Sequence, residues 1–194
     1  YHPKLSGYTT TKDCITQDYP YVECIQSMLG FCDEVVVVDG GSTDGTWESL
    51  VDLAKTDQRI VIHQQVRDWN HPRFAVFDGA QKALARSLCT GDYCWQQDSD
   101  EIVHENDYRK ILDIVKFIPK NIPLLSLPVI EYWGDTSKVR IDVNVWKWRL
   151  SQNLPTTTHG IPKELRSFDE DGNLFSEPGC DGCFYVKSDS YEMM

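Results

Sequence analysis

The chain has 194 residues, of which 41% are hydrophobic and 25% are charged. This composition suits one folded domain with a sizeable core and excludes an intrinsically disordered chain. The formal net charge is −11, from 19 Lys and Arg against 30 Asp and Glu. Such a surface repels polyanions, which argues against nucleic acid as a partner.

Two features bear on location. No signal-peptide pattern and no apolar run long enough to span a bilayer is seen in the sequence. These observations predict no transmembrane segment and favour a cytoplasmic protein, free or peripheral at a membrane. The first residue is Tyr rather than Met, so we expect a longer parent chain.

The first two thirds of the sequence alternates short apolar runs with amphipathic stretches. Strands are predicted over residues 5–10, 34–39, 59–66 and 93–97. Helices are predicted over residues 21–29, 45–55, 74–88 and 106–117, with capping oxygens from Ser42, Thr43 and Asp44 before the second one. This order predicts an α/β fold with a mostly parallel central sheet flanked by helices.

The pattern changes after Pro119. Further strands are predicted over residues 124–132 and 143–150, within an aromatic-rich stretch punctuated by prolines. We expect a mixed C-terminal part at the edge of the same sheet. No element is predicted beyond Ser151.

The seven cysteines are expected to be mostly buried free thiols, since their number is odd and five lie among apolar or helical residues. Cys180 and Cys183 form a CxxC pair, for which a redox or metal site is the alternative.

Two acidic motifs follow predicted strands. Asp39 ends the apolar run in "VVVVDGGSTDG", and "DSD" places Asp98, Ser99 and Asp100 after the strand over residues 93–97. Ligands of open α/β sheets bind outside the carboxyl ends of parallel strands, so we expect both motifs at one edge. Paired carboxylates in a negative protein suit Mg²⁺ or Mn²⁺, which would offset a bound diphosphate. The alternatives are an ordinary capped turn at Asp39 and a solvent-facing acidic pair.

These residues resemble family 2 glycosyltransferases of the GT-A fold, within the nucleotide-diphospho-sugar transferase superfamily. "EVVVVDGGSTDGT" is similar to the family's strand, Asp and Ser-Thr-Asp-Gly turn, and "GDYCWQQDSDEIVHE" resembles its metal-binding DxD segment. "YTTTKDCITQDYPYVECIQSML" is similar to its opening strand, loop and helix. Many relatives carry Asp-Asp where this chain has Asp39-Gly40, and Asn where it has Lys12-Asp13.

The resemblance implies a single domain over residues 1–194, with a nucleotide-sugar-binding half at 5–117 and an acceptor half, truncated if the parent is longer, at 118–194. The implied activity is a metal-dependent, hexosyltransferase-like and inverting transfer from a nucleotide-diphospho sugar to a glycan, lipid or protein acceptor. Asp39 would bind the base or ribose. Thr10 and Thr11 would line the nucleotide pocket, unless they only bond within the strand end. Asp98, Ser99 and Asp100 would hold the diphosphate through Mn²⁺ or Mg²⁺.

The acceptor half supplies the remaining candidates. The resemblance implies His159 as a further metal ligand, with a plain loop histidine as the alternative. An inverting transferase needs a carboxylate base, for which Glu131 ranks first, ahead of Asp135 and Asp142. Arg73 and Lys82 could reach a phosphate, but solvated surface is the more ordinary position for such side chains.

Two other functions stay open at this point. "DSDEIV" approaches the haloacid dehalogenase motif, which would make the protein a phosphatase, although that motif normally ends the first strand of its domain. The chain could also be a non-catalytic module or a fragment that binds a nucleotide sugar without turnover.

Overall fold

The computed structural model describes residues 3–70 and 74–154. Its main sheet has six strands in the order β3-β2-β1-β4-β8-β5. The parallel strands are β1 (Leu5–Thr11), β2 (Glu34–Asp39), β3 (Ile60–Gln64) and β4 (Tyr93–Gln96). The mixed part consists of β5 (Leu124–Pro128) and of β8 (Trp146–Gln152), which is antiparallel to both β4 and β5. The predicted mostly parallel α/β sheet with a mixed second part is confirmed.

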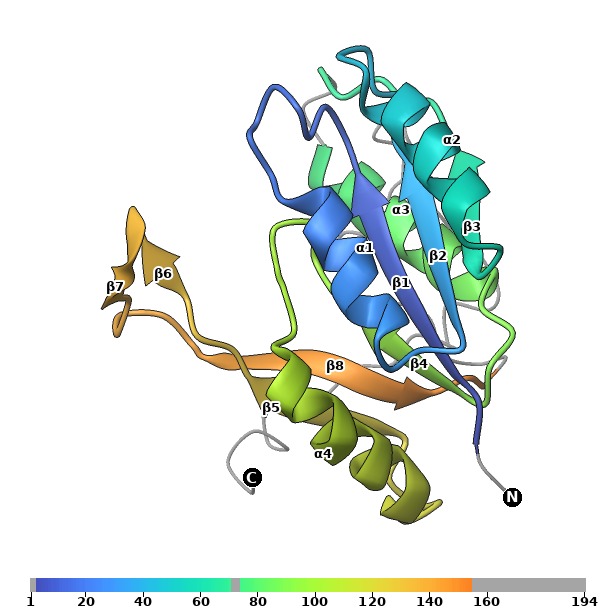
Figure 1. The fold of residues 1–194 in the computed structure, drawn as a ribbon, viewed down its shortest axis with the longest axis vertical. Helices are drawn as coiled ribbons and strands as arrows, with labels where there is room; N and C mark the ends of the chain where they lie inside the picture. Colours follow the sequence, from blue (N-terminus) through green and yellow to red (C-terminus); the bar gives the residue numbers. More distant parts are fainter. Residues whose placement is uncertain (1–2, 71–73, 155–194) are drawn as a thin grey trace.

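Helices lie on both faces of this sheet (Figure 1). Those in the described residues are α1 (Tyr21–Leu29), α2 (Thr46–Thr56), α3 (Phe74–Ser87) and α4 (Glu105–Phe117). The unbroken apolar run of β2 follows from this arrangement, because successive strand residues point to opposite faces. Val35 and Val37 join the core cluster of α1 and α2, whereas Val36 and Val38 pack in a second cluster with Ala85 of α3.

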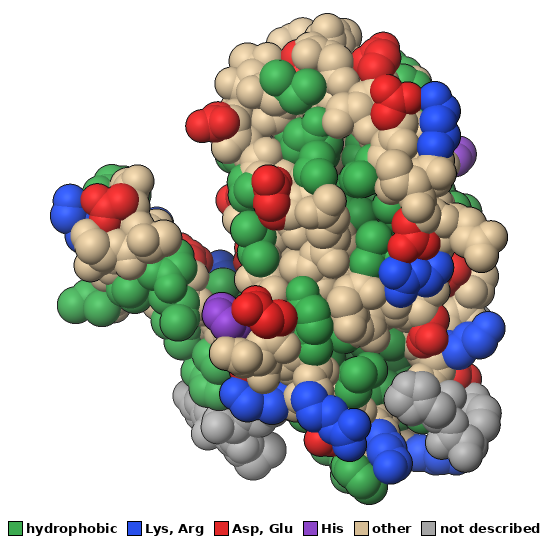
Figure 2. Space-filling model, viewed as in Figure 1, with side chains coloured by type: hydrophobic (Ala, Val, Ile, Leu, Met, Phe, Trp, Pro, Cys, Tyr) green, Lys and Arg blue, Asp and Glu red, His purple; other side chains and the backbone are tan. Residues whose placement is uncertain are grey.

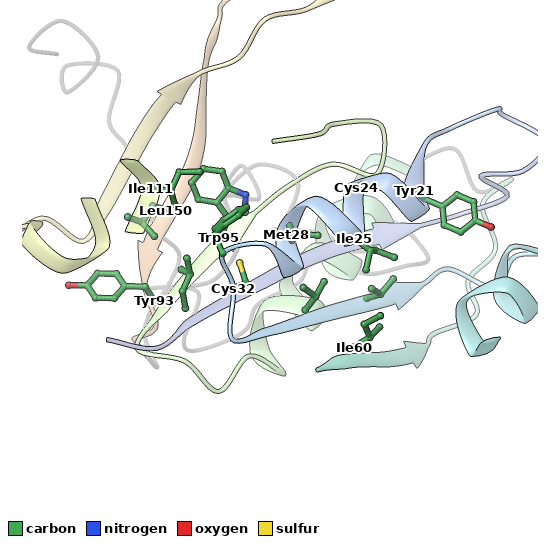
Figure 3. Close-up of a cluster of buried hydrophobic side chains, with 14 of the residues drawn as sticks. Tyr21, Cys24, Ile25, Met28, Cys32, Ile60, Tyr93, Trp95, Ile111 and Leu150 are labelled. Atoms are coloured by element: carbon green, nitrogen blue, oxygen red, sulfur yellow. The ribbon is translucent and has the colours of Figure 1, made fainter. Parts of the chain in front are cut away.

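The larger core cluster extends along one face of the sheet, from α1 to α4 (Figure 3). Ile25 and Met28 of α1 are fully buried, and Ile111 of α4 packs in the same cluster as Leu150 of β8. Phe31, which follows α1, packs against Trp95 of β4 in this cluster, with ring centroids 5.2 Å apart in an edge-on arrangement. The five cysteines in the described residues are buried free thiols, as predicted: Cys14, Cys24, Cys32, Cys89 and Cys94.

Most predicted boundaries hold within a few residues, and the larger departures have local causes. The strand predicted over 124–132 ends at Pro128, although the Val129 N–H still donates to the Val145 carbonyl at 2.8 Å. Helix α2 begins at Thr46, because Gly45 takes a left-handed φ of 97°. Of the three predicted capping residues, Asp44 accepts a hydrogen bond from the Thr46 N–H, at 3.0 Å.

A small hairpin, not predicted as such, joins β5 to β8. Its strands are β6 (Tyr132–Trp133) and β7 (Asp135–Val139), and it projects away from the main sheet (Figure 1). Its exposed apolar side chains include Tyr132, Trp133 and Val139, and apolar surface gathers along it in Figure 2. None of the helices in the described part of the chain has the length and apolarity of a membrane span.

Candidate functional site

The strand order creates a switch point beside β1. The chain passes from β1 to β2 and β3 on one side, then returns to β4 on the other side of β1. Loops that leave β1 and β4 therefore diverge at the carboxyl edge, which is where open α/β sheets bind ligands. A cleft of about 240 Å³ lies here. It is lined by Thr10, Thr11, Lys12, Gln17, Tyr19, Trp69, Asp78, Gln81, Lys82, Asp98, Ser99 and Asp100.

Asp39 lies beside this cleft as a fully buried carboxylate at the end of β2. Its Oδ1 accepts hydrogen bonds from the main-chain N–H groups of Gly41 (2.9 Å) and Ser42 (2.8 Å) and from the Gln64 amide (3.2 Å). Its Oδ2 accepts from the hydroxyls of Thr11 (2.9 Å) and Ser42 (2.6 Å). The carboxylate thus fixes the turn after β2 and joins it to the end of β1.

Asp13 makes the next link between the loops after β1 and β2. It has a left-handed φ of 48°, and its Oδ1 accepts a hydrogen bond from the Thr43 N–H at 2.7 Å. Its own N–H donates to the Ser42 hydroxyl at 2.8 Å. Burial alone would raise the pKa of Asp13, but its pairing with Lys12 and the Thr43 bond lower it. The Lys12-Asp13 pair therefore holds the loop that follows β1.

Gly40 and Gly41 let the turn after β2 pass beneath Trp69. A Cβ on Gly40 would come within 2.6 Å of the Trp69 ring, and the indole Nε1 donates to the Gly40 carbonyl at 2.8 Å. Gly41 has a φ of 87°, which side-chain-bearing residues rarely adopt. An Asp-Asp sequence at positions 39 and 40 would displace the indole that forms one wall of the cleft.

Asp98 and Lys82 form an ion pair inside the cleft. The Lys82 Nζ lies 2.8 Å from Oδ1 of Asp98 and 3.4 Å from Oδ2 of Asp78. Burial alone would lower the pKa of Lys82, but Asp98 and Asp78 raise it, so it is a cation at neutral pH. Burial alone would raise the pKa of Asp98, but Lys82, with Arg149 and Gln96, lowers it. The carboxylate of Asp98 therefore stays ionised.

Glu101 and Arg149 form a second, more deeply buried pair behind the acidic turn. The Arg149 Nη2 donates to Oε1 of Glu101, and the side chain of Arg149 is only 5% exposed. The other Glu101 oxygen, Oε2, accepts the main-chain N–H of Asp98 at 2.9 Å. Burial raises the pKa of Glu101, although Arg149 acts against this shift. Glu101 thus stabilises the turn that carries Asp98.

The structure brings most of the predicted donor-site residues together. Five of them line the cleft: Thr10, Thr11, Asp98, Ser99 and Asp100. Asp39 touches one of these, Thr11, but both of its oxygens are engaged within the protein. Direct contact of Asp39 with a base or ribose stays a prediction.

Glu131 directly precedes strand β6 of the hairpin and is not among the residues that line the cleft. Its Oε1 is 3.1 Å from the Lys147 Nζ, and its Oε2 is 3.7 Å from Nη1 of Arg140. The carboxylate of Glu131 thus lies between two cations, Lys147 of β8 and Arg140 of the segment after β7. Its role as the base stays a prediction.

The two lower-ranked base candidates, Asp135 on β7 and Asp142 in the segment after β7, are both exposed. Hydrogen bonds from Ser137 lower the pKa of Asp135, and those from Arg140 lower the pKa of Asp142. Their role as the base stays a prediction, as it does for Glu131. Other candidates lie outside the described residues, namely Arg73, His159, Cys180 and Cys183.

Several cleft residues were missed by sequence reasoning. Lys82 was named as a residue that could reach a phosphate, with solvated surface as the more ordinary position, and its side chain is only 18% exposed and pairs with Asp98. Lys82 follows Asp78 by four residues on α3, and Gln81 follows Asp78 by three, so the sequence spacing places all three on neighbouring positions of one helix face. This spacing was the sequence feature that could have indicated a shared site. Trp69 and Tyr19 lie in loops without periodicity, and no local pattern points to them.

The acidic turn fits a hard divalent cation of the kind that also binds phosphate. The described hydrogen bond from Gln96 and the ion pair with Lys82 both reach Oδ1 of Asp98, and Asp98 lines the cleft together with Asp100. Mg²⁺ and Mn²⁺ are commonly held by one or two carboxylates, with waters and substrate phosphates as the other ligands. Among the described residues, no group of three or more His, Cys, Asp or Glu side chains converges on such a site.

Comparisons with known proteins agree with this architecture. The chain is similar to the mannosyltransferase PcManGT from Pyrobaculum calidifontis, solved with GDP-Man and Mn²⁺, with 20% identity and a TM-score of 0.51 over 65% of this chain and 35% of that one. It is also similar to S. aureus TarS, with 17% identity and a TM-score of 0.48 over 77% of this chain and 47% of that one. The chain thus spans less than half of each of these structures.

The likeness to PcManGT shows a shared fold and confirms the predicted GT-A-like class. No curated protein sequence gives a significant match. The model of the family described as "Glycosyl transferase family 2" matches residues 22–180, which is most of the sequence. The chain therefore belongs to glycosyl transferase family 2.

Proposed function

We propose that the chain transfers a sugar from a nucleotide-diphospho sugar to an acceptor hydroxyl, with a divalent cation bound at Asp98 and Asp100. One observation carries the proposal: the end of β1, with Thr10 and Thr11, and the acidic turn after β4 line one cleft at the switch point of the sheet. Family membership and the Mn²⁺ and GDP-Man complex of a structural neighbour support it.

The charges that line the cleft explain why a cation would be needed. Lys12 and Lys82 carry two positive charges, whereas Asp78, Asp98 and Asp100 carry three negative ones, so the lining has a net charge of −1. A diphosphate would be repelled from this surface and from a chain of net charge −11. A divalent cation would reverse the sign of the cleft to +1.

Each end of the cleft has its own chemistry. Asp98 and Asp100 would hold the cation, with His159 as a third protein ligand, and the Lys82 ammonium would contact a phosphate oxygen. The bound cation would stabilise the negative charge of the departing nucleoside diphosphate. The nucleoside would lie toward Thr10, Thr11, Tyr19 and Trp69, where the cleft has hydroxyls and aromatic rings.

The second half of the chain would supply the acceptor side. In an inverting transfer, the acceptor oxygen bonds to the anomeric carbon as the bond to the diphosphate breaks, and a carboxylate takes the acceptor proton. Glu131 is our candidate for this base. The exposed aromatic side chains of Tyr132 and Trp133 beside it offer faces that could stack on an acceptor sugar.

The proposal is tested by thermal unfolding of the full chain with UDP-, GDP- and dTDP-sugars, each with Mn²⁺ and with EDTA. A ligand that binds the native state raises Tm by mass action, and a CMP-sugar serves as the monophosphate control. We expect one diphospho sugar class to raise Tm in Mn²⁺ only. A flat response to every donor would contradict the proposal.

Turnover separates the remaining alternatives. Slow release of the nucleoside diphosphate from the bound donor supports a transferase, whereas binding without release supports a non-catalytic module. The phosphatase alternative is disfavoured by the family match and by the acidic motif, which follows β4 rather than the first strand.

A further inference from the structure

Arg149 connects the two halves of the chain at the acidic turn. It lies on β8, whose antiparallel pairing with β4 sets Leu150 opposite Trp95. Arg149 is therefore next to the carboxyl end of β4, where Gln96 precedes the turn. A guanidinium has donors on a rigid fork and can contact two partners at once.

Both branches of this fork lead to Asp98. Through one branch, Nη1 donates to Oε1 of Gln96, and the Gln96 amide donates to Oδ1 of Asp98 at 2.8 Å. Through the other, Nη2 donates to Oε1 of Glu101, whose Oε2 accepts the Asp98 N–H at 2.9 Å. One branch fixes the carboxylate of Asp98 and the other fixes its main chain.

The Gln96 branch also determines how the amide is oriented. Because Oε1 of Gln96 accepts from Arg149, its NH₂ group must face Asp98 and donate to it. Lys82 contacts the same Oδ1 from α3, at 2.8 Å. Two donors thus hold Oδ1 of Asp98, and Asp98 lines the cleft together with Asp100.

Stability alone is a weak explanation for this arrangement. A buried ion pair costs desolvation that its attraction roughly repays, so an apolar pair of equal volume would serve a core as well. The Arg149–Glu101 pair differs from such a pair because both partners are linked to Asp98. Glu101 accepts the Asp98 N–H, and Arg149 binds Gln96, whose amide donates to the Asp98 carboxylate.

We propose that Arg149 is a positioning residue that orients the Asp98 carboxylate for the cation–diphosphate complex, acting through Gln96 and Glu101. This role rests on the proposed function. It makes donor binding depend on β8, which belongs to the acceptor half. Residues that orient metal ligands in this indirect way typically change metal affinity by about 10–100-fold when replaced.

The test compares the affinity of the full chain for UDP and for GDP by calorimetry, in Mn²⁺ and in EDTA. The main variant combines Arg149→Met with Glu101→Gln, which leaves no unpaired buried charge. The amide oxygen that replaces the Glu101 carboxylate would still accept the Asp98 N–H. Gln96→Met removes the carboxylate branch alone. Arg149→Lys keeps the charge but lacks the fork, so we expect it to rescue affinity in part.

Arg86→Met is the matched control. Arg86 is also buried and also bonds to β8, through the Ser151 hydroxyl and the Gln152 carbonyl, each at 2.6 Å. Neither of these contacts leads to Asp98, so its loss should lower Tm and leave Mn²⁺-dependent affinity unchanged.

We expect the double variant and Gln96→Met to stay folded and to lose about tenfold or more in Mn²⁺-dependent affinity. If both bind within about twofold of the unmodified chain, or if Arg86→Met loses as much, the positioning role is wrong while the proposed function stands. If the unmodified chain binds neither UDP nor GDP in Mn²⁺, the proposed function fails and the role of Arg149 fails with it.

Discussion

Replacement of Asp39 by Ala removes a fully buried carboxylate that accepts five hydrogen bonds. The hydroxyl and amide donors can turn toward other partners, but the N–H groups of Gly41 and Ser42 are fixed by the turn. A buried donor without a partner costs about 1–3 kcal/mol, and because these two bonds are part-buried we expect the lower end, about 2 kcal/mol in total. A loss of about 2 kcal/mol lowers Tm by about 4–8 °C in a domain of this size.

Thermal and urea unfolding, followed by circular dichroism, measure this loss. Asp39→Asn is the first control, because its amide oxygen can still accept the two main-chain N–H groups and its NH₂ can donate to the Thr11 hydroxyl. We expect it to cost about 1 kcal/mol. Asp100→Ala is the second control, because it removes an exposed carboxylate and should leave Tm nearly unchanged.

The outcome distinguishes a structural from a ligand-binding Asp39. If Asp39→Ala melts within about 2 °C of the unmodified protein, well below the shift expected from the stranded donors, the reasoning from these hydrogen bonds is refuted. If Asp39→Ala keeps its Tm but loses nucleotide affinity, the carboxylate binds the ligand directly, as the sequence resemblance implied.

Three further predictions follow from the cleft and the hairpin. Lys82→Met removes the ammonium that lies 2.8 Å from Asp98, and calorimetry with UDP or GDP in Mn²⁺ should show affinity lower by about tenfold or more. Unchanged affinity would mean that Lys82 only pairs with the carboxylates of the protein and does not contact the diphosphate. Gly40→Ala places a Cβ about 2.6 Å from the Trp69 ring, so urea unfolding should show a loss of about 1–3 kcal/mol, and full stability would mean that the indole moves freely. Glu131→Gln should bind donor and Mn²⁺ normally but lose transfer of a labelled sugar by about 100-fold or more, and near-normal transfer would move the base elsewhere.

Much of the fold could be predicted because its signals are local. The run of β-branched residues within Glu34–Asp39 favours a strand buried on both faces, and the predicted bounds of β2 and α1 match the structure. Strand β7 has no such signal, since the whole of Asp135–Val139 is exposed and mostly polar. Its pairing depends on β6, not on a buried face.

The candidate site divides in the same way. The rule that ligands bind at the carboxyl ends of parallel strands placed Asp98 and Asp100 correctly in the cleft, because it needs only the strand order. The burial of Asp39 depends on Thr11 and Gln64, which come from neighbouring strands. The fork of Arg149 depends on the antiparallel pairing of β8 with β4. Contacts of this kind leave no periodicity in the sequence.

The central claim is that the cleft binds a nucleoside diphosphate through a cation at the acidic turn. Its most direct test is a calorimetric titration of the full chain with UDP and with GDP, in Mn²⁺ and in EDTA, with Asp100→Asn as the matched variant. The proposal predicts binding in Mn²⁺, no detectable binding in EDTA, and a loss of Mn²⁺-dependent affinity in Asp100→Asn at unchanged Tm. Equal affinity in Mn²⁺ and in EDTA, or full affinity in Asp100→Asn, would contradict it.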